Sequence, residues 1–526
     1  MKKIIINVFT VVIFILGITS CSDFLKEIPK NQISVDQYFK IPADARSIVN
    51  TLYSEGVPTF YNSGDWEGTP MMLDGYMSGL FDNARKERLG PTEAQNLTLS
   101  PTILQDYMFS LWSTCYNAIS QSNNALKYIP GIVGLSQSES SKLLAEARFF
   151  RALNYFYMVK HFGDVPLITK PYGSLDSINV ERDADKKVYD QITTDLEWAL
   201  NDGGLVDVPF YMNGFRITKG AVATLLADVY LQMAGYPVQS EGAYSKAAKF
   251  ARIVINSGQY KLISNGATPK ESAYNVMRTS NTEREYIYSY ECDPQLRTNN
   301  SPKYCVPMEH KPPFCIYESP WNAYRPLNEF VRIYNPDVDL RIQNSQLWHN
   351  KIIRNGVTYD FNGDWAAYLW YDEKAIYETG RGSMNINIYG YAEVLLIAAE
   401  AIARSEGVTP EAVSYLTDVR SRAYWETDRD QIKSELEGLS VDLFIKEVWK
   451  ERLRELPFYF KTWPDIQRTR LYPVTNPNNS GEVNFENVVG HTNPWGATFK
   501  EYHLLFPISK ITLQRNPNII EDSYPN

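Results

Sequence analysis

The chain has 526 residues, of which 44% are apolar and 21% are charged. This apolar fraction is close to the globular average, which excludes a disordered or collagen-like chain. Lysine and arginine number 52 against 61 acidic residues, a net charge of −9. Because nucleic-acid binders meet the phosphates with a basic excess, we expect no nucleic-acid partner. Aromatic residues are abundant at 13%, whereas the 5 histidines offer little for a metal site or a histidine-based catalyst.

The N-terminus has the pattern of a targeting segment. Two lysines precede the apolar run 4–18, which is shorter than the ~20 residues of a transmembrane helix and is typical of a secretory signal peptide. The run ends in Ile-Thr-Ser-Cys, which resembles the bacterial lipoprotein box, where the cysteine becomes acylated. We therefore predict a signal peptide over 1–20, a lipid anchor on Cys21 and a lipidated tether over 21–40. A secreted protein with a free Cys21 is the alternative.

Helical periodicity dominates two blocks, about 100–255 and about 389–470. Ser100-Pro101 is expected to cap the first helix, and Ser136 opens a capping box before the second. Recurring helical hairpins with small residues at their contacts are similar to tetratricopeptide repeats. The predicted helices are about 100–128, 136–162, 185–200, 218–233, 243–255, 391–404, 409–424 and 440–456.

Long segments without helical period interrupt this scaffold, at about 56–99 and 256–382, and 472–500 has the same character. Their aromatic content argues against disorder, and long ordered loops are usually functional. One strand-like piece is 286–290, Tyr-Ile-Tyr-Ser-Tyr. We predict a single, mostly α domain over 41–526, a helical-hairpin scaffold that carries irregular, aromatic-rich insertions.

The remaining cysteines are expected to lie on loops of a secreted protein, where disulfides are permitted but their connectivity is not legible. A zinc knuckle is the weaker alternative for Cys305, His310 and Cys315, because Cys292 lies too far away in sequence. The cysteines beyond the anchor are Cys115, Cys292, Cys305 and Cys315.

Motifs for catalysis and metals are sparse. The chain lacks Gly-x-Ser-x-Gly and His-Glu-x-x-His, and it lacks a phosphate-binding glycine loop. Two carboxylate pairs are formally available to a glycosidase, Asp337/Asp339 and Asp372/Glu373. The stretch 360–364, Asp-x-Asn-x-Asp, is spaced like a calcium loop but lacks the sixth-position glycine and the final glutamate, so we expect a turn. We predict a protein without enzymatic activity, cofactor or metal.

Five stretches, in the right order, resemble the SusD/RagB lipoproteins of Bacteroidota. They are 145–167 (AEARFFRALNYFYMVKHFGDVPL), 218–227 (TKGA entering LLA), 391–401 (YAEVLL with AEA), 451–468 (ER-x-x-EL, W-x-D and R) and 505–518 (LFPI with NPN). The resemblance implies a SusD-like tetratricopeptide fold with a binding face made of irregular insertions. It also implies a SusC-like TonB-dependent outer-membrane barrel as partner, and capture of oligosaccharides, or in some members peptides, without chemistry.

Sugar binding uses flat aromatic faces and a few planar polar groups. The candidates lie on the insertions, because scaffold aromatics such as Phe149, Tyr155 and Trp449 have helical spacing and are predicted to be core. Trp321 is favoured, since the turn-rich setting Ser-Pro-Trp-Asn is expected to present it outward. The predicted ligand-binding residues are Trp66, Asp74, Tyr76, Arg85, Tyr290, Tyr317, Trp321, Asn322, Tyr324 and Trp365, with Arg325 and Trp370 as neighbours.

The predicted function is that of a cell-surface lipoprotein, anchored in the outer membrane and facing the exterior, that captures a glycan and delivers it to the barrel. A peptide-binding member of the same family, a helical glycosidase and a pure interaction scaffold are the alternatives. The sequence does not identify the particular glycan.

Overall fold

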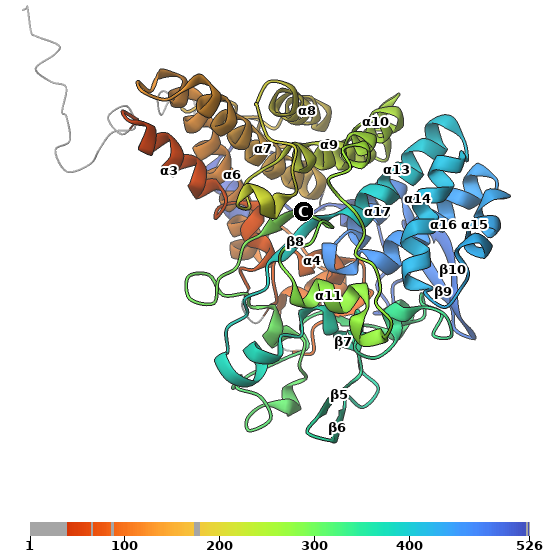
Figure 1. Ribbon diagram of the computed structural model, residues 1–526. Helices are drawn as coiled ribbons and strands as arrows, with labels where there is room; N and C mark the ends of the chain where they lie inside the picture. Colours follow the sequence, from red (N-terminus) through yellow and green to blue (C-terminus); the bar gives the residue numbers. More distant parts are fainter. Residues whose placement is uncertain (1–38, 65–66, 86–88, 173–178, 522–523, 525–526) are drawn as a thin grey trace, which may run out of the picture.

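The computed structural model describes residues 39–64, 67–85, 89–172, 179–521 and 524. Helices occupy the upper part of the molecule in Figure 1, and the irregular insertions lie below them. Cys21 and Trp66 lie outside the described residues. Within the described ranges no helix is both long and apolar enough to cross a membrane.

The scaffold is a stack of helices in which each packs against the next: α6 against α7, α7 against α8, and onward through α9, α10, α13 and α14, with α16 against α13 (Figure 1). The long second insertion separates α10 from α13 in sequence, yet the two are neighbours. The two helical blocks therefore form one continuous array. Its members are α6 (Gln105–Tyr128), α7 (Gln137–Phe162), α8 (Asp185–Asn201), α9 (Lys219–Ala234), α10 (Ala243–Asn256), α13 (Tyr391–Glu406), α14 (Pro410–Ala423) and α16 (Val441–Glu455).

Local capping chemistry explains where most of these helices begin. Ser136 Oγ accepts the backbone N–H of Glu139 at 3.2 Å, and Thr218, Thr409 and Ser440 cap α9, α14 and α16 in the same way. The predicted cap at Ser100 is wrong. Ser100 Oγ accepts the N–H of Ile103 within a separate turn, and α6 starts only after Leu104, whose φ is 55°.

Several helices were not predicted. The larger ones are α3 (Pro42–Leu52), α15 (Arg429–Glu437) and α17 (Thr462–Thr469). α15 is almost entirely polar and buries only Ile432 and Leu436 at i and i+4, so its sequence has little helical periodicity. The short ones are α4 (Met72–Met77), α5 (Leu89–Gln95), α11 (Ala273–Thr279), α12 (Asn328–Val331) and α18 (Lys510–Arg515).

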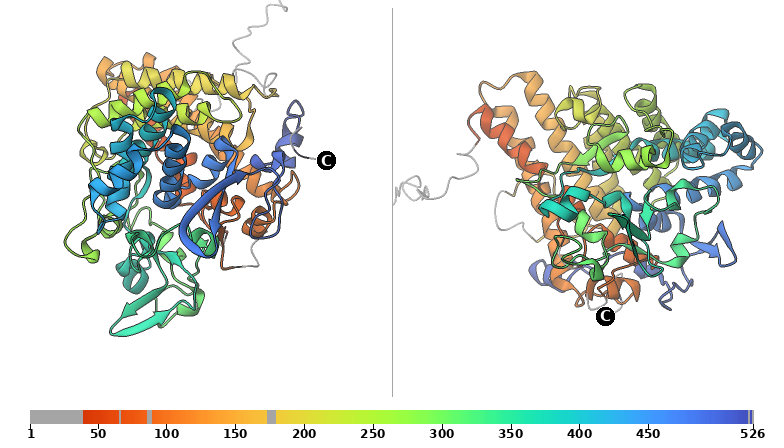
Figure 2. Two further views of the ribbon diagram at one scale, coloured as in Figure 1. Left: turned by 90° about the vertical axis from the view of Figure 1, so that its right-hand side faces the viewer. Right: turned by 60° about the horizontal axis from the view of Figure 1, so that its bottom comes forward.

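The strands form short antiparallel pairs. Strand β2, predicted from its Tyr-Ile-Tyr-Ser-Tyr sequence, pairs with β8 where the second insertion leaves and rejoins the scaffold. The β5–β6 hairpin projects at the end of the molecule farthest from the helices, in Figure 1 and in the left view of Figure 2. The pairs are β2 (Tyr286–Tyr290) with β8 (Ile386–Gly390), β1 (Phe81–Asp82) with β3 (Arg325–Pro326), β4 (Trp348–His349) with β7 (Ala366–Ala367), β5 (Lys351–Arg354) with β6 (Val357–Asp360), and β9 (Leu471–Asn476) with β10 (Asn479–Asn487).

One hydrophobic core runs through the scaffold and into the insertions. Phe149 and Tyr155 are fully buried, as predicted, and so is the apolar stripe of α8 from Val188 to Leu196. Trp449 is only half-buried and packs edge-on against Phe485. The insertions therefore share the core of the helical array.

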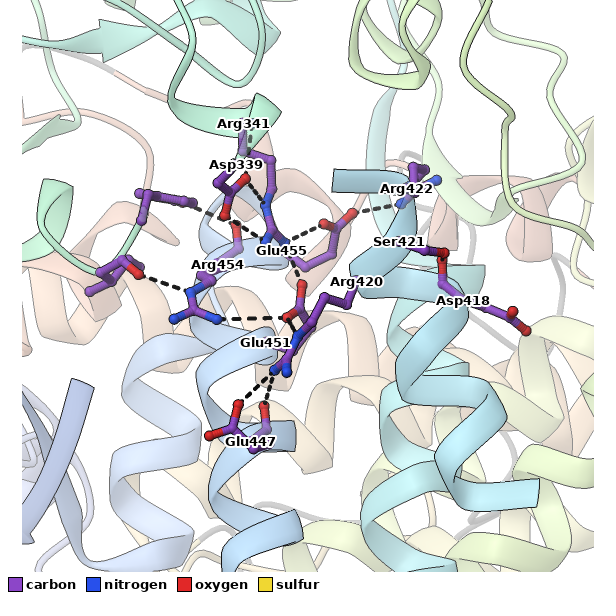
Figure 3. Close-up of polar contacts among 12 residues, drawn as sticks. Asp339, Arg341, Asp418, Arg420, Ser421, Arg422, Glu447, Glu451, Arg454 and Glu455 are labelled. Atoms are coloured by element: carbon purple, nitrogen blue, oxygen red, sulfur yellow. Dashed lines mark hydrogen bonds and ion pairs between the residues drawn. The ribbon is translucent and has the colours of Figure 1, made fainter. Parts of the chain in front are cut away.

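A buried network of ion pairs ties the second insertion to the scaffold (Figure 3). Arg341 lies in the insertion with its side chain fully buried, and its guanidinium is 2.8 Å from each of Asp339, Glu451 and Glu455. The two glutamates project from successive turns of α16. Burial opposes the ionisation of Glu451, but the surrounding arginines outweigh it and hold its pKa at about 2.

Helix α14 supplies two further arginines to this network. Arg420 Nε donates to Glu451 at 2.9 Å, and Arg422 pairs with Glu455 at 2.6 Å and with Glu285 at 2.5 Å. Glu285 directly precedes β2, so the start and the middle of the insertion are held by one set of charges. We call this set the junction network; it comprises Glu285, Asp339, Arg341, Arg420, Arg422, Glu451 and Glu455.

Candidate ligand-binding surface

The two predicted binding insertions meet through a small sheet. Phe81 pairs with Pro326 and Asp82 with Arg325 across the β1–β3 ladder. Just beyond this ladder, the N–H of Ala84 donates to the carbonyl of Asn322 at 3.0 Å. Candidates from both insertions are thereby brought to one place.

A tryptophan flanked by two cations lies at this meeting point. The guanidinium of Arg85 is 5.0 Å from the ring centroid of Trp321, and the Lys303 ammonium is 5.5 Å from the same centroid. Tyr304 packs edge-on against the indole at 4.9 Å. Trp321 is only 3% exposed, so the expectation that its turn presents it outward is wrong. Its ring therefore contacts the two cations through cation–π interactions.

Asn322 connects this tryptophan to a second one. Its Nδ2 donates to the carbonyl of Trp365 at 2.6 Å, whereas its buried Oδ1 has no hydrogen-bond partner among the described residues. The Trp365 side chain is half-buried. Beside it, Asp364 accepts from Arg325 at 2.7 Å, and Arg325 also pairs with Asp82. We call Arg85, Lys303, Trp321, Asn322 and Trp365 the Trp321 surface.

Three other candidates belong to the core beneath this surface. Asp74 is 2% exposed and its Oδ1 is 2.8 Å from His161 Nε2. Tyr76 is 1% exposed and donates its hydroxyl to the carbonyl of Ala323. Tyr324 is fully buried and stacks on Phe81 at 4.1 Å. Tyr76 and Tyr324 therefore join the two insertions, whereas Asp74 ties the first insertion to His161 of the scaffold helix α7.

The remaining aromatic candidates have contacts of their own. Tyr290 ends β2 and lies under the guanidinium of Arg297, 4.9 Å from the ring centroid. Tyr317 is half-buried, and burial raises the pKa of its hydroxyl. Trp370 packs against Phe458 at 5.2 Å. Their binding of a ligand remains a prediction, as does that of Trp66, which lies outside the described residues.

Lys303 was not among the predicted residues, because aromatic side chains and their adjacent polar groups define the sequence pattern of a sugar site. It precedes Tyr304 in an ordinary Ser-Pro-Lys-Tyr turn, and no local pattern marks it. Its backbone carbonyl accepts the N–H of Trp321 at 3.0 Å, a contact that only the folded chain reveals.

Each of the two carboxylate pairs available to a glycosidase has one member with a structural partner. Asp339 belongs to the junction network, and Asp372 Oδ1 accepts the N–H of Ala375 at 3.0 Å. The segment 360–364 is a turn, as predicted, in which Asp360 accepts the N–H of Asn362 at 2.7 Å. Among the described residues no cluster of three or more histidine, cysteine or acidic side chains is arranged to hold a metal.

The four described cysteines are free thiols. Cys115 lies within α6 and is fully buried, so its predicted placement on a loop is wrong. Cys305 is also fully buried, and burial raises the pKa of both thiols. Neither is therefore activated as a nucleophile.

Comparison with known proteins gives consistent matches along the chain. A family model described as "Starch-binding associating with outer membrane" matches residues 23–231, and the SusD family model matches residues 315–524. SusD-like protein P2 of Formosa agariphila is 26% identical over 482 residues, which cover 88% of this chain and 90% of that protein.

Solved structures agree with this similarity. A SusD superfamily protein from Parabacteroides distasonis is 28% identical, with a TM-score of 0.78 over 91% of this chain and 98% of that one. Surface glycan-binding protein A from Bacteroides thetaiotaomicron, in complex with laminarihexaose, shares the fold at 16% identity, with a TM-score of 0.68 over 92% and 100% of the two chains. The predicted tetratricopeptide-like scaffold is confirmed, and the chain belongs to the SusD/RagB family.

Proposed function

We propose that this protein is a lipid-anchored binding protein of the bacterial surface that captures an oligosaccharide and delivers it to a SusC-like TonB-dependent transporter, without acting on it chemically. The observation that carries the proposal is the Trp321 surface, which both insertions build together. Family membership and the glycan-binding relatives support the ligand class.

The chemistry of the surface suits a sugar. Trp365 offers part of a flat apolar ring for the C–H face of a pyranose. Arg85 and Lys303 are half-buried donors at the Trp321 ring, and contact with that ring limits their rotamers before a ligand arrives. A few fixed polar groups beside an apolar face are what orient a ligand that is mainly hydroxyls.

The test is affinity electrophoresis of the full chain through gels that contain plant, host or microbial glycans, with Trp365→Ala beside the natural chain. Loss of a stacking contact is expected to weaken retention by roughly thirtyfold, about 2 kcal/mol. The matched control is Trp495→Ala, a 36% exposed tryptophan on the loop after β10. Equal retention of both variants would contradict the assignment of this surface, and release of reducing ends from a glycan would favour a glycosidase.

The membrane anchor is tested at Cys21. We expect Cys21→Ala to abolish membrane association without changing thermal unfolding, because acylation of this cysteine is the proposed anchor. Fractionation after high-salt washing measures the effect. Persistent association of the variant with membranes would contradict the anchor.

The transporter partner is tested by gentle detergent extraction of outer membranes, followed by capture of the tagged natural chain. We expect a TonB-dependent barrel to co-purify with it. Recovery of the chain alone, under conditions in which other outer-membrane complexes survive, would contradict the delivery step.

A further inference from the structure

A cleft of about 570 Å³ opens beside the Trp321 surface, on the part of the second insertion below the helices. One wall contains Asn275 and Arg278 of α11, and another contains residues of β4 and β5. The floor includes the half-buried Tyr368 and the buried Tyr371. We call it the cationic cleft; it is lined by Pro269, Lys270, Asn275, Arg278, Asn344, Ser345, Gln346, His349, Lys351, Ile352, Ile353, Tyr368 and Tyr371.

The charges of this lining differ from those of the whole chain. Lys270, Arg278 and Lys351 contribute three positive charges, and none of the lining residues is a carboxylate, although the chain carries a net charge of −9. Within the described part of the chain none of these three cations forms an ion pair. Asp372 lines an adjoining cavity instead, where its carboxylate accepts the N–H of Ala375. An excess of one charge in a concave site attracts a ligand of the opposite sign.

Arg278 is held in place by the aromatic floor. Its guanidinium carbon is 4.9 Å from the Tyr368 ring centroid and 5.8 Å from that of Tyr371. Nη1 donates to the carbonyl of Tyr371 at 2.9 Å and Nη2 to Asn275 Oδ1 at 3.3 Å, while the buried Nε has no partner among the described residues. Every hydrogen-bond partner of Arg278 is neutral, and the nearby Asp372, which lines the adjoining cavity with it, forms no ion pair with its guanidinium.

His349 adds a buried acceptor. The ring is fully buried, and Nε2 is 3.0 Å from the carbonyl of Cys305. A carbonyl only accepts, so Nε2 carries the hydrogen; burial lowers the pKa of the ring to about 3, which keeps it neutral. Nδ1 is therefore an acceptor, and it lacks a hydrogen-bond partner in the described ranges. Buried polar atoms are usually satisfied, so this acceptor calls for a small donor such as a water molecule.

We propose that the cationic cleft is a binding subsite for the acidic substituent, carboxylate or sulfate, of an anionic oligosaccharide. The three cations receive the negative group, and the tyrosine rings of the floor hold Arg278 in position for it. The inference rests on the proposed glycan-binding function and narrows it from glycans in general to acidic ones.

The position of the cleft allows one ligand to use both sites. His349 pairs with Ala366 across the β4–β7 ladder, and Ala366 directly follows Trp365 of the Trp321 surface. Tyr368 lies three residues beyond Trp365, so their Cα atoms are at most about 11 Å apart. An oligosaccharide of a few units is long enough to contact both.

The test is calorimetric titration of the full chain with three probes: hexagalacturonate, a sulfated carrageenan hexasaccharide and neutral laminarihexaose. We expect an acidic probe to bind at least tenfold more tightly than laminarihexaose, with an affinity that falls between 50 and 500 mM NaCl, because salt screens charges near the surface. The two acidic probes separate a uronate ligand from a sulfated one.

The decisive variant is Lys270→Met/Lys351→Met, which changes an exposed and a half-buried side chain and leaves the core intact. It is expected to lower the affinity for the acidic probe by roughly tenfold or more, as for loss of charge-assisted contacts. Laminarihexaose binding is expected to stay unchanged. Lys261→Met is the control, since this exposed lysine lines a separate cavity of about 430 Å³.

The possible failures are distinguishable. Equal affinity for acidic and neutral probes, or an acidic affinity that the double variant leaves unchanged, would overturn the subsite while glycan binding stands. Binding of none of the three probes, by a chain that the glycan gels retain, would overturn the subsite, whereas retention by none of those gels would contradict the proposed function.

Discussion

The junction network and the cationic cleft both belong to the second insertion, and both are built around arginine, yet they differ in where the opposite charge comes from. In the junction network, Arg341 has three carboxylates at 2.8 Å and no exposed surface. In the cleft, Arg278 contacts only neutral groups, beside Lys270 and Lys351. A cation whose counter-charges come from its own chain holds the fold together, whereas one without them remains available to a ligand.

Breaking the junction network should have the largest effect. Arg341→Met leaves Asp339, Glu451 and Glu455 buried with less compensation, and removing one partner of a buried ion pair costs roughly 3–5 kcal/mol. We expect the upper end of that range in the free energy of unfolding, because three carboxylates are affected. Chemical denaturation measures it.

The control for this variant is Arg429→Met. Arg429 pairs with Asp418 at 2.5 Å, but the two side chains are 46% and 38% exposed. Exposed pairs contribute about 0–1 kcal/mol, so this change should be nearly neutral. Similar decreases in the free energy of unfolding of the two variants would mean that burial of the junction network adds nothing to the stability of the fold.

Trp321→Ala should have the next largest effect. Because the indole is 3% exposed, its removal leaves a cavity, for which about 3 kcal/mol is the lower end of the usual cost. Loss of the ring also frees Arg85 and Lys303, so ligand affinity should fall as well. Thermal unfolding and glycan titration of the same preparation measure the two effects, and an unchanged melting temperature would contradict the buried placement.

A smaller, pH-dependent effect on the free energy of unfolding is expected at a set of buried charges outside the junction network. Glu393 of α13 lies 2.8 Å from Lys461, which also pairs with Asp228 of α9 at 2.9 Å. Burial raises the pKa of Glu393 to about 7, with Asp228 adding to the increase and Lys461 and Arg452 opposing it. The folded chain therefore holds a proton at Glu393 that the unfolded chain releases near pH 4.5.

The direction of the pH dependence of stability follows from this proton. Between pH 4.5 and 7 the stability contributed by Glu393 should fall as the pH rises, by at most about 1.4 kcal/mol per pH unit. Glu393→Gln should flatten that part of the profile, and denaturation at several pH values measures it. An identical slope in both proteins would contradict the raised pKa.

The local sequence determined the helical scaffold to a large extent. Helix periodicity and capping depend on residues a few positions apart, so α7 was predicted from Ser136 to Gly163 and the buried stripe of α8 was identified correctly. Helix α15 was not predicted because a polar surface helix has little periodicity in its apolar residues. Most of the motifs that carried the family resemblance lie in these same helices, whereas the stretch 505–518 lies outside them.

Tertiary structure alone decided which insertion residues are buried and which are accessible. Composition pointed to the insertions, which stays a prediction, and the fold brings Arg85, Trp321, Asn322 and Trp365 together as candidates. The burial of Tyr76, however, depends on the carbonyl of Ala323, 247 positions away, and no local pattern encodes such a contact. The cationic cleft could not be predicted for the same reason. Lys270, Arg278 and Lys351 belong to no recognisable sequence motif. Their positive charges form a site only because the fold places them in one lining that contains no carboxylate.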